Sequence, residues 1–186
     1  ARPAGLPPPD LNVVSLCQTR DGSLLIGTYS LGPYRLRAGQ ARIEPVSKTF
    51  QDSAIRAILE DREGGLWFGS HAAGLEHLKN GDLRRYDSAH GLSNNCITAI
   101  AQDGAGDIWA GTQEGLYRIK DGEVTAYFKQ DGLGANLVNA LLVDQSGVLW
   151  VGTMGGGLAR HKDGRFARVT SAQGLARDEV TQILED

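Results

Sequence analysis

"DREGGLWFGS" (residues 61–70) places a tryptophan between two apolar residues, behind a glycine turn and ahead of a Gly-Ser step. The pattern returns as "RDGSLLIGT", "DGAGDIWAGT" and "DQSGVLWVGT". Its last glycine is Gly27, Gly69, Gly111 and Gly152, at steps of 42, 42 and 41 residues. Two further glycine series, in "RAGQ/KNGD/KDGE/KDGR" and in "HGLSNN/DGLGAN/QGLARD", keep the same spacing. Three series in phase indicate an internal repeat.

The repeat divides the chain into units of about 42 residues. The units are 11–52, 53–94, 95–135 and 136–177, and a fifth unit begins within 178–186 with "EVTQILED". The first unit diverges most, because Leu25 stands where the others carry Trp67, Trp109 and Trp150.

Each unit contains four short apolar runs that we interpret as β-strands. In the second unit they are "IRAILED" (55–61), "LWFGS" (66–70), "GLEHLK" (74–79) and "LRRYD" (83–87). The Asn80-Gly81 step and its counterparts Asp121-Gly122 and Asp163-Gly164 are strong signals for two-residue hairpins. No run shows sustained helical periodicity. Four antiparallel strands in about 42 residues predict an all-β chain of β-propeller blades.

A blade lies between two neighbours, so both of its faces need apolar residues. Ile55 and Ile58 point to opposite faces of their strand, and Leu75 and Leu78 repeat this arrangement. We therefore expect the column Leu25, Trp67, Trp109 and Trp150 to fill the walls between blades, with each indole N–H bonded to a carbonyl. The recurring aspartate before the turn, Asp61 in the second unit, is expected to cap that turn.

The motif D-x-x-G-x-[LI]-W-[VFA]-G-[TS] followed by G-L resembles the two-component regulator propeller repeat. It is carried by 61–70 with Gly74-Leu75, 103–112 with Gly115-Leu116, and 144–153 with Gly157-Leu158. The resemblance implies a periplasmic sensor propeller of a bacterial signalling protein, placed ahead of a histidine kinase or diguanylate cyclase module. Family propellers usually have about seven blades, so four and a fraction leave closure open.

The first and last blades of a repeat array each leave an apolar face that must be covered. Three arrangements can cover these faces. The chain can be part of a longer propeller, two chains can form a ring of about eight blades, or four blades can close alone. We favour self-association. The segment 178–186 can also pair with the first blade or with another chain. An excised or engineered array is a further reading, since the chain opens with Ala1 and stops inside a unit.

Function is expected on the loops that follow the second strands and on the loops that join blades, because these loops vary while the scaffold stays fixed. A small molecule or a glycan is the expected ligand. The candidate binding residues are His71, Gln113, Met154, Asn94, Asn95, Asn136, Arg177 and Asp178. Their alternative role is local turn formation, which is common for Asn and Asp.

Catalysis has less support in the sequence. The four histidines occupy different columns of the repeat, so they predict no metal site, and no cofactor motif is present. His161 is expected to cap an exposed or associating face. The alternative is a propeller enzyme resembling virginiamycin B lyase, which needs a histidine and an acid on adjacent loops. Only His71 and His90 are suitable, and neither has an obvious partner in the sequence.

Composition sets the remaining limits. A hydrophobic fraction of 41% and a charged fraction of 22% are typical of a globular domain. The net charge of −3, with both signs interspersed, argues against a nucleic-acid partner. No apolar run reaches the length of a membrane span. Cys17 and Cys96 fall in different columns, which favours two free buried thiols.

Overall fold

The computed structural model describes residues 11–47, 49–50 and 54–185, which form four sheets of four antiparallel strands. Blade 1 contains β1 (Val13–Gln18), β2 (Leu24–Thr28), β3 (Pro33–Leu36) and β4 (Ile43–Pro45). Blade 2 contains β5 (Ile55–Glu60), β6 (Leu66–Ser70), β7 (Leu75–Lys79) and β8 (Asp82–Tyr86). Blade 3 contains β9 (Ile97–Gln102), β10 (Ile108–Thr112), β11 (Gly115–Lys120) and β12 (Glu123–Tyr127). Blade 4 contains β13 (Val138–Val143), β14 (Leu149–Thr153), β15 (Leu158–Lys162) and β16 (Arg165–Val169).

Within each blade, strands adjacent in sequence are adjacent in the sheet. The all-β propeller-blade fold expected from the repeat is therefore confirmed. The helical elements assigned to the described residues are three single turns of 3-10 helix in the connections between blades and after blade 4, namely η1 (Ser88–His90), η2 (Lys129–Asp131) and η3 (Ser171–Gln173). These turns were not expected from the sequence.

The hairpins between third and fourth strands have the geometry that their sequences predict. Asn80, Asp121 and Asp163 have φ of 51–52°, and the glycine after each also has positive φ. Two consecutive left-handed residues form the type I′ turn that matches the twist of antiparallel strands. Blade 1 has Ala38-Gly39 here, where only the glycine has positive φ, and its fourth strand is three residues long.

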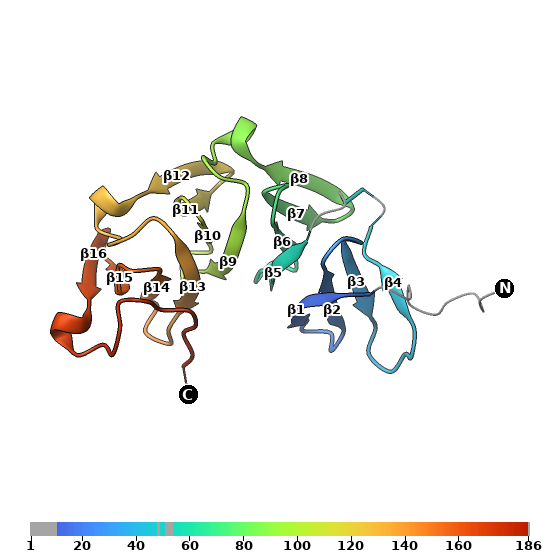
Figure 1. Ribbon diagram of the computed structural model, residues 1–186. Helices are drawn as coiled ribbons and strands as arrows, with labels where there is room; N and C mark the ends of the chain where they lie inside the picture. Colours follow the sequence, from blue (N-terminus) through green and yellow to red (C-terminus); the bar gives the residue numbers. More distant parts are fainter. Residues whose placement is uncertain (1–10, 48, 51–53, 186) are drawn as a thin grey trace.

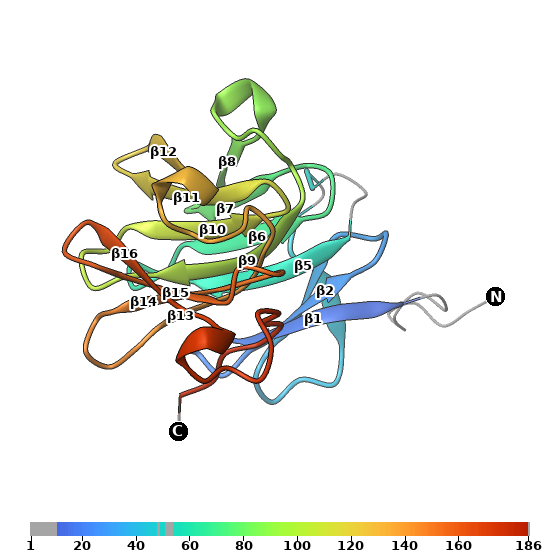
Figure 2. The ribbon, with the colours of Figure 1, turned by 60° about the vertical axis from the view of Figure 1, so that its left-hand side comes forward.

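The four sheets lie face to face along an open arc (Figure 1, and the turned view in Figure 2). The first strands β1, β5, β9 and β13 lie at the inside of the arc and contact one another in sequence order. The fourth strands lie at its outer rim. Each wall between two blades is consequently made from one face of each sheet.

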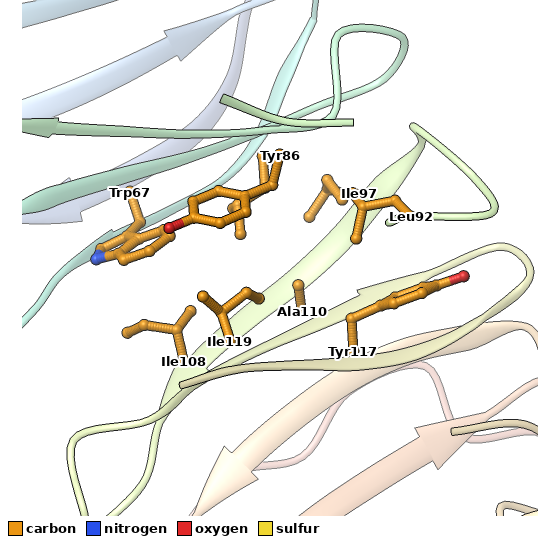
Figure 3. Close-up of a cluster of buried hydrophobic side chains, with 9 residues drawn as sticks. Trp67, Tyr86, Leu92, Ile97, Ile108, Ala110, Tyr117 and Ile119 are labelled. Atoms are coloured by element: carbon orange, nitrogen blue, oxygen red, sulfur yellow. The ribbon is translucent and has the colours of Figure 1, made fainter. Parts of the chain in front are cut away.

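The buried apolar residues form three clusters, one for each wall between blades. Between blades 2 and 3, Trp67 lies with Ile108, Tyr117 and Ile119 of the following blade (Figure 3). Trp109 takes the equivalent place between blades 3 and 4, and Leu25 between blades 1 and 2. Trp150, on the outward face of blade 4, is only half-buried.

Each wall tryptophan donates a hydrogen bond to the recurring aspartate of its own blade. The indole Nε1 atoms of Trp67, Trp109 and Trp150 lie 2.8, 2.8 and 2.7 Å from Oδ2 of the aspartate six residues earlier. The other carboxylate oxygen accepts backbone N–H groups of the turn, as Asp103 Oδ1 does from Ala105 and Asp107. The predicted turn cap is present. The expected carbonyl partner for the indole was wrong, because the carboxylate that caps the turn also reaches the ring.

Blade 1 lacks both members of this pair. Thr19 stands in the aspartate position and Leu25 in the tryptophan position. There Asp21 caps the turn instead, since its Oδ1 accepts hydrogen bonds from the Thr19 hydroxyl at 2.6 Å and from the Ser23 N–H at 2.9 Å. An indole without an acceptor would leave a polar N–H unsatisfied in the wall, so the aspartate and the tryptophan are replaced together.

The glycine after the tryptophan column lets the next blade approach. A Cβ atom on Gly69, Gly111 or Gly152 would lie 2.5–2.7 Å from the side chain of the first inner residue of the next unit: Ile97, Val138 or Val180. These separations are shorter than carbon atoms tolerate. A glycine here is thus a condition for blade packing.

Polar side chains on the inner strands link successive blades. The Ser15 hydroxyl donates to the Ile55 carbonyl at 2.6 Å, and the Thr98 hydroxyl to the Val138 carbonyl at 2.7 Å. Asn139 Nδ2 donates to the Val180 carbonyl at 3.1 Å. The first two bonds satisfy carbonyls at the start of β5 and β13, where the register of each ladder shifts.

The C-terminal segment 179–185 continues the sequence pattern and lies where a fifth inner strand would begin, although it forms an isolated bridge and not a strand. Val180 occupies the space above Gly152, its N–H donates to the Thr153 carbonyl at 3.0 Å, and Met154 and Glu179 form an isolated β-bridge. No second strand pairs with this segment among the described residues. Leu184, in the column that faces the next blade, is 81% exposed.

Both cysteines are free thiols. Cys96 is buried, as expected, whereas Cys17 is only half-buried, although it packs against the cluster between blades 1 and 2. Burial raises the pKa of both thiols.

Replacing Gly111 with valine should destabilise the chain by about 1–3 kcal/mol, because the new side chain collides with Val138 in a packed wall. Urea denaturation followed by tryptophan fluorescence measures the change. Gly104→Ala is the matched control: nothing lies within 4 Å of its Cβ position and its φ is not positive. The control should stay within about 0.5 kcal/mol of the unchanged chain. Equal stabilities for the two variants would contradict the close-approach role.

The indole–carboxylate bond can be measured by a double-mutant cycle. Asp103→Ala and Trp109→Phe should couple by about 1–2 kcal/mol in the free energy of unfolding, because each change alone leaves the other group unpaired. Glu123→Ala combined with Trp109→Phe is the control cycle, since Glu123 is exposed at a hairpin. Its effects should add. Additive effects in the Asp103 cycle would mean that the bond contributes nothing to stability.

Candidate ligand-binding ring on the loop face

Two sets of loops meet at one end of the blades. The loop after each second strand contacts the connection to the next unit, as shown by the bonds from Gly74 N to Asn95 O at 3.1 Å and from Gly157 N to Asp178 O at 2.9 Å. We call this end the loop face. The tight hairpins lie at the opposite end of the strands.

A buried hydroxyl at the end of each second strand fixes the loop that follows. Ser70 Oγ donates to the Gly74 carbonyl at 3.0 Å and accepts the Ala73 N–H at 2.7 Å. Thr28, Thr112 and Thr153 make the equivalent bonds to the carbonyls of Gly32, Gly115 and Gly157. All four hydroxyl residues are at most 1% exposed. Buried hydroxyl groups at the ends of the second strands therefore fix the backbone of these loops through hydrogen bonds.

The residue directly after that hydroxyl forms a ring of equivalent positions, which we call the loop ring. Its members are Tyr29, His71, Gln113 and Met154, and all four side chains are exposed, Tyr29 by 60% and Met154 by 42%. In three blades the backbone N–H at this position donates to a carbonyl that precedes the inner strand: Asn12, Ala54 or Leu137, each at 2.9 Å. A fixed backbone with an exposed, variable side chain is the arrangement expected of a recognition surface.

The loop ring contains three of the residues predicted from the sequence and adds Tyr29. Tyr29 was missed because the first unit is the most divergent. The signal was nevertheless readable, since Tyr29 follows Gly27-Thr28 just as Met154 follows Gly152-Thr153. None of the four side chains is an acid, a lysine or an arginine, so the ring presents aromatic, thioether, amide and imidazole groups.

The predicted asparagines and Asp178 have local partners. The side-chain oxygen of Asn95, Asn136 and Asp178 accepts the backbone N–H seven residues earlier, at 2.8, 2.6 and 2.5 Å. Each bond ties the first residue of a 3-10 turn to the start of the next unit. Asn94 Oδ1 accepts the Cys96 N–H at 2.8 Å, whereas Arg177 is exposed. These residues shape the connections that flank the loop ring.

Two histidines on the loop face have partners that the sequence did not reveal. His71 Nδ1 lies 3.1 Å from the buried Cys96 Sγ. His90 Nδ1 lies 2.7 Å from Asp87 Oδ1, and the histidine lowers the pKa of that carboxyl.

The His90–Asp87 contact repeats a structural device. In the two later connections the equivalent residues are Asp131 and Gln173, and each side chain accepts the N–H of the residue that precedes the 3-10 turn, at 2.8 and 3.0 Å. All three side chains thus reach back to the residue that precedes the turn, but His90 meets the Asp87 carboxylate, whereas Asp131 and Gln173 accept a backbone N–H. This recurrence indicates capping of the turn, as in a capping box, as the shared role.

Two hollows between blades lie at the opposite, hairpin end. One of about 380 Å³ lies between blades 2 and 3 and is lined by Asp61, Trp67, His77 and Asp107, among others. His77 stacks on Trp67 with ring centroids 3.9 Å apart. Burial lowers the pKa of His77, and the nearby Asp61 carboxylate only partly opposes this effect.

His161 occupies the equivalent wall between blades 3 and 4. Its ring centroid lies 5.0 Å from that of Trp109 and 4.6 Å from that of Phe166. It was expected to cap an exposed or associating face, but it is half-buried inside the wall between two blades of the same chain. Burial and the Arg118 guanidinium lower its pKa, while Asp103 acts in the opposite direction.

Stability should therefore depend on pH through His161. A depressed pKa means that the unfolded chain binds this proton more readily, so the free energy of unfolding should be level above about pH 7 and fall as the pH drops below the ordinary histidine value of about 6.5. His161→Ile, the residue type that blade 3 carries at this position, should reduce the loss between pH 7 and pH 5. Urea denaturation at successive pH values measures it. An unchanged pH profile would contradict a wall role for a neutral imidazole.

Comparison with known proteins agrees with this architecture. The family model described as "SMP-30/Gluconolactonase/LRE-like region" matches residues 81–184, more than half of the chain. The chain belongs to the SMP-30/gluconolactonase/LRE-like region family. The model described as "Two component regulator propeller" matches residues 7–30 and 49–72. The resemblance read from the tryptophan motif is thus confirmed, and the two models together cover parts of all four repeats.

Solved structures share the fold of this SMP-30/gluconolactonase/LRE-like chain. The extracellular domain of a hybrid two-component system from B. thetaiotaomicron has a TM-score of 0.78 at 24% identity, over 95% of this chain and 25% of that one. Virginiamycin B lyase from Staphylococcus aureus has a TM-score of 0.74 at 15% identity, over 89% of this chain and 58% of that one. No curated protein matches the sequence.

The chain thus spans a quarter to somewhat over half the length of these propellers. Identities below 25% show a common fold and leave function open. The described residues contain no helix that is both long and apolar enough to cross a membrane.

Proposed function

We propose that this chain is a non-catalytic ligand-binding module of a bacterial signalling protein, placed outside the cytoplasm in the periplasm. The blades 11–52, 53–94, 95–135 and 136–177 act as one array that presents the loop ring. The similarity to the extracellular domain of a two-component system supports this class of function. The proposal rests above all on the loop ring, whose backbone is fixed by buried hydroxyls while its side chains are exposed and differ between blades.

The chemistry of the ring favours a neutral ligand with both apolar and hydroxyl groups, such as an oligosaccharide. The exposed Tyr29 ring offers an apolar face for a sugar ring, and the Gln113 amide offers a donor and an acceptor. An anion would meet no lysine or arginine, and a cation no aspartate or glutamate, among the four ring residues. Aromatic faces with a few polar groups are typical of small-molecule sites.

An enzyme of the lyase type is the alternative. The observation in its favour is the His90–Asp87 pair on the loop face, in a fold shared with virginiamycin B lyase. The return contacts of Asp131 and Gln173 in the equivalent turns favour the structural role of this pair. The binding module is therefore the function that we propose.

The proposal is tested by titrating neutral malto-, cello- and xylo-oligosaccharides into the chain and measuring heat and shifts in melting temperature. Tyr29→Ala and Gln113→Ala should each weaken binding about tenfold or more, because each removes a direct contact. Glu123→Ala, exposed at a hairpin of the opposite end, should bind like the unchanged chain. Binding that survives both ring changes, or an absence of binding across the panel, would contradict this site.

A further inference from the structure

The outward face of blade 1 is built like a face that receives another blade. Leu16 is 60% exposed and Val13 is 45% exposed. The residues equivalent to Leu16 in the next three blades are Ile58, Ile100 and Leu141, and each packs into the wall with the preceding blade. Blade 1 therefore exposes, on its outward face, the same type of apolar residue that blades 2 to 4 bury at the equivalent position.

The match extends across the sheet. In blade 3, Ile108 and Ile119 lie opposite Trp67 of the preceding blade, and Tyr117 lies farther along the same cluster, near Leu92 and Ile97 (Figure 3). The paired strands β2 and β3 carry Leu24, Tyr34 and Leu36 at the same register positions, since Leu24 pairs with Leu36 as Ile108 pairs with Ile119. Blade 1 thus repeats the apolar residues with which blade 3 faces the preceding blade: the pair opposite the tryptophan and the tyrosine farther along.

The outward face of blade 4 is the matching donor surface. Trp150 keeps its bond to Asp144 at 2.7 Å, yet it is half-buried, whereas Trp67 and Trp109 are at most 4% exposed. Gly152 provides the close approach that an inner strand needs. Segment 179–185 lies in that position with a single β-bridge, while β1 holds to β2 through five paired positions.

We propose that a second copy of this chain docks its blade 1 on blade 4, with β1 replacing segment 179–185 as the inner strand beside Gly152. Val13 would take the place of Val180, as Ile97 and Val138 lie beside the glycines of blades 2 and 3. Gln18 would accept the Gln145 N–H in place of Glu185, just as Gln102 accepts the Arg62 N–H at 2.8 Å. The contact joins two different surfaces, so two copies related by a twofold axis would make it twice and close a ring.

This inference goes beyond the proposed function and also completes its site. One chain supplies four loop-ring positions along an open arc (Figure 1). A pair of chains would supply eight, so the second copy would contribute side chains to the rim that surrounds a ligand.

Light scattering after size exclusion tests the pairing. The unchanged chain should show twice the mass of one copy, and Leu16→Glu should halve that mass, because it places a charge in the new wall. Leu184→Glu is the matched control: the residue is more exposed than Leu16 but lies on the displaced segment, so the pair should persist. Circular dichroism and melting temperature establish that each variant is folded.

Mixing distinguishes this contact from a face that pairs with itself. Leu16→Glu disables the receiving face, and Trp150→Arg disables the donor face. Each variant alone should be a monomer, and an equimolar mixture should recover a pair through the one intact contact. A monomeric unchanged chain at every concentration, or a pair unaffected by Leu16→Glu, would overturn the proposal. So would a mixture that remains monomeric while the unchanged chain pairs.

Discussion

The structure depends on a wall that no blade can make alone. A single four-stranded sheet has two apolar faces, and water is kept from both only when another sheet covers each of them. The tryptophan supplies much of the apolar surface of the wall, and its N–H is the polar group that the wall must also satisfy. The aspartate six residues earlier accepts the hydrogen bond of the indole, and its other oxygen caps the turn that precedes the tryptophan strand. One carboxylate therefore couples local turn geometry to packing between blades.

The same constraint explains the glycine that follows the tryptophan. The inner strands converge toward the inside of the arc, so the next strand lies directly above the glycine backbone. Gly69, Gly111 and Gly152 leave room for Ile97, Val138 and Val180. The tryptophan and the glycine two positions later therefore belong to one interface. The spacing between neighbouring sheets is larger toward the outer rim, where the tryptophan fills it, and small at the inner strands, where only glycine fits.

This rigid wall makes the loop face suitable for recognition. The hydroxyls of Ser70 and its equivalents satisfy the loop backbone, and the side-chain oxygens of Asn95, Asn136 and Asp178 tie the connections to the following units. With the backbone fixed by these groups, Tyr29, His71, Gln113 and Met154 can differ without affecting the fold. Separating the residues that hold the loops from those that face solvent allows one scaffold to carry different ligand surfaces.

The sequence by itself determined the period, the four strands of each unit, the type I′ hairpins and the columns that carry tryptophan, aspartate and glycine. These features are local or periodic, so they can be predicted from the linear sequence. Only the tertiary structure decided that the carboxylate of Asp103 meets the indole of Trp109, that His161 lies inside a wall, and that Asn95 caps a turn seven residues earlier. It also decided that Tyr29 belongs with His71, Gln113 and Met154, and that blade 1 exposes Leu16. The contacts of Asp103 and Asn95 depend on how side chains fold back within one blade or connection. The places of His161, Tyr29 and Leu16 depend on which sheet faces meet, because residues about forty positions apart become neighbours only when the blades are stacked.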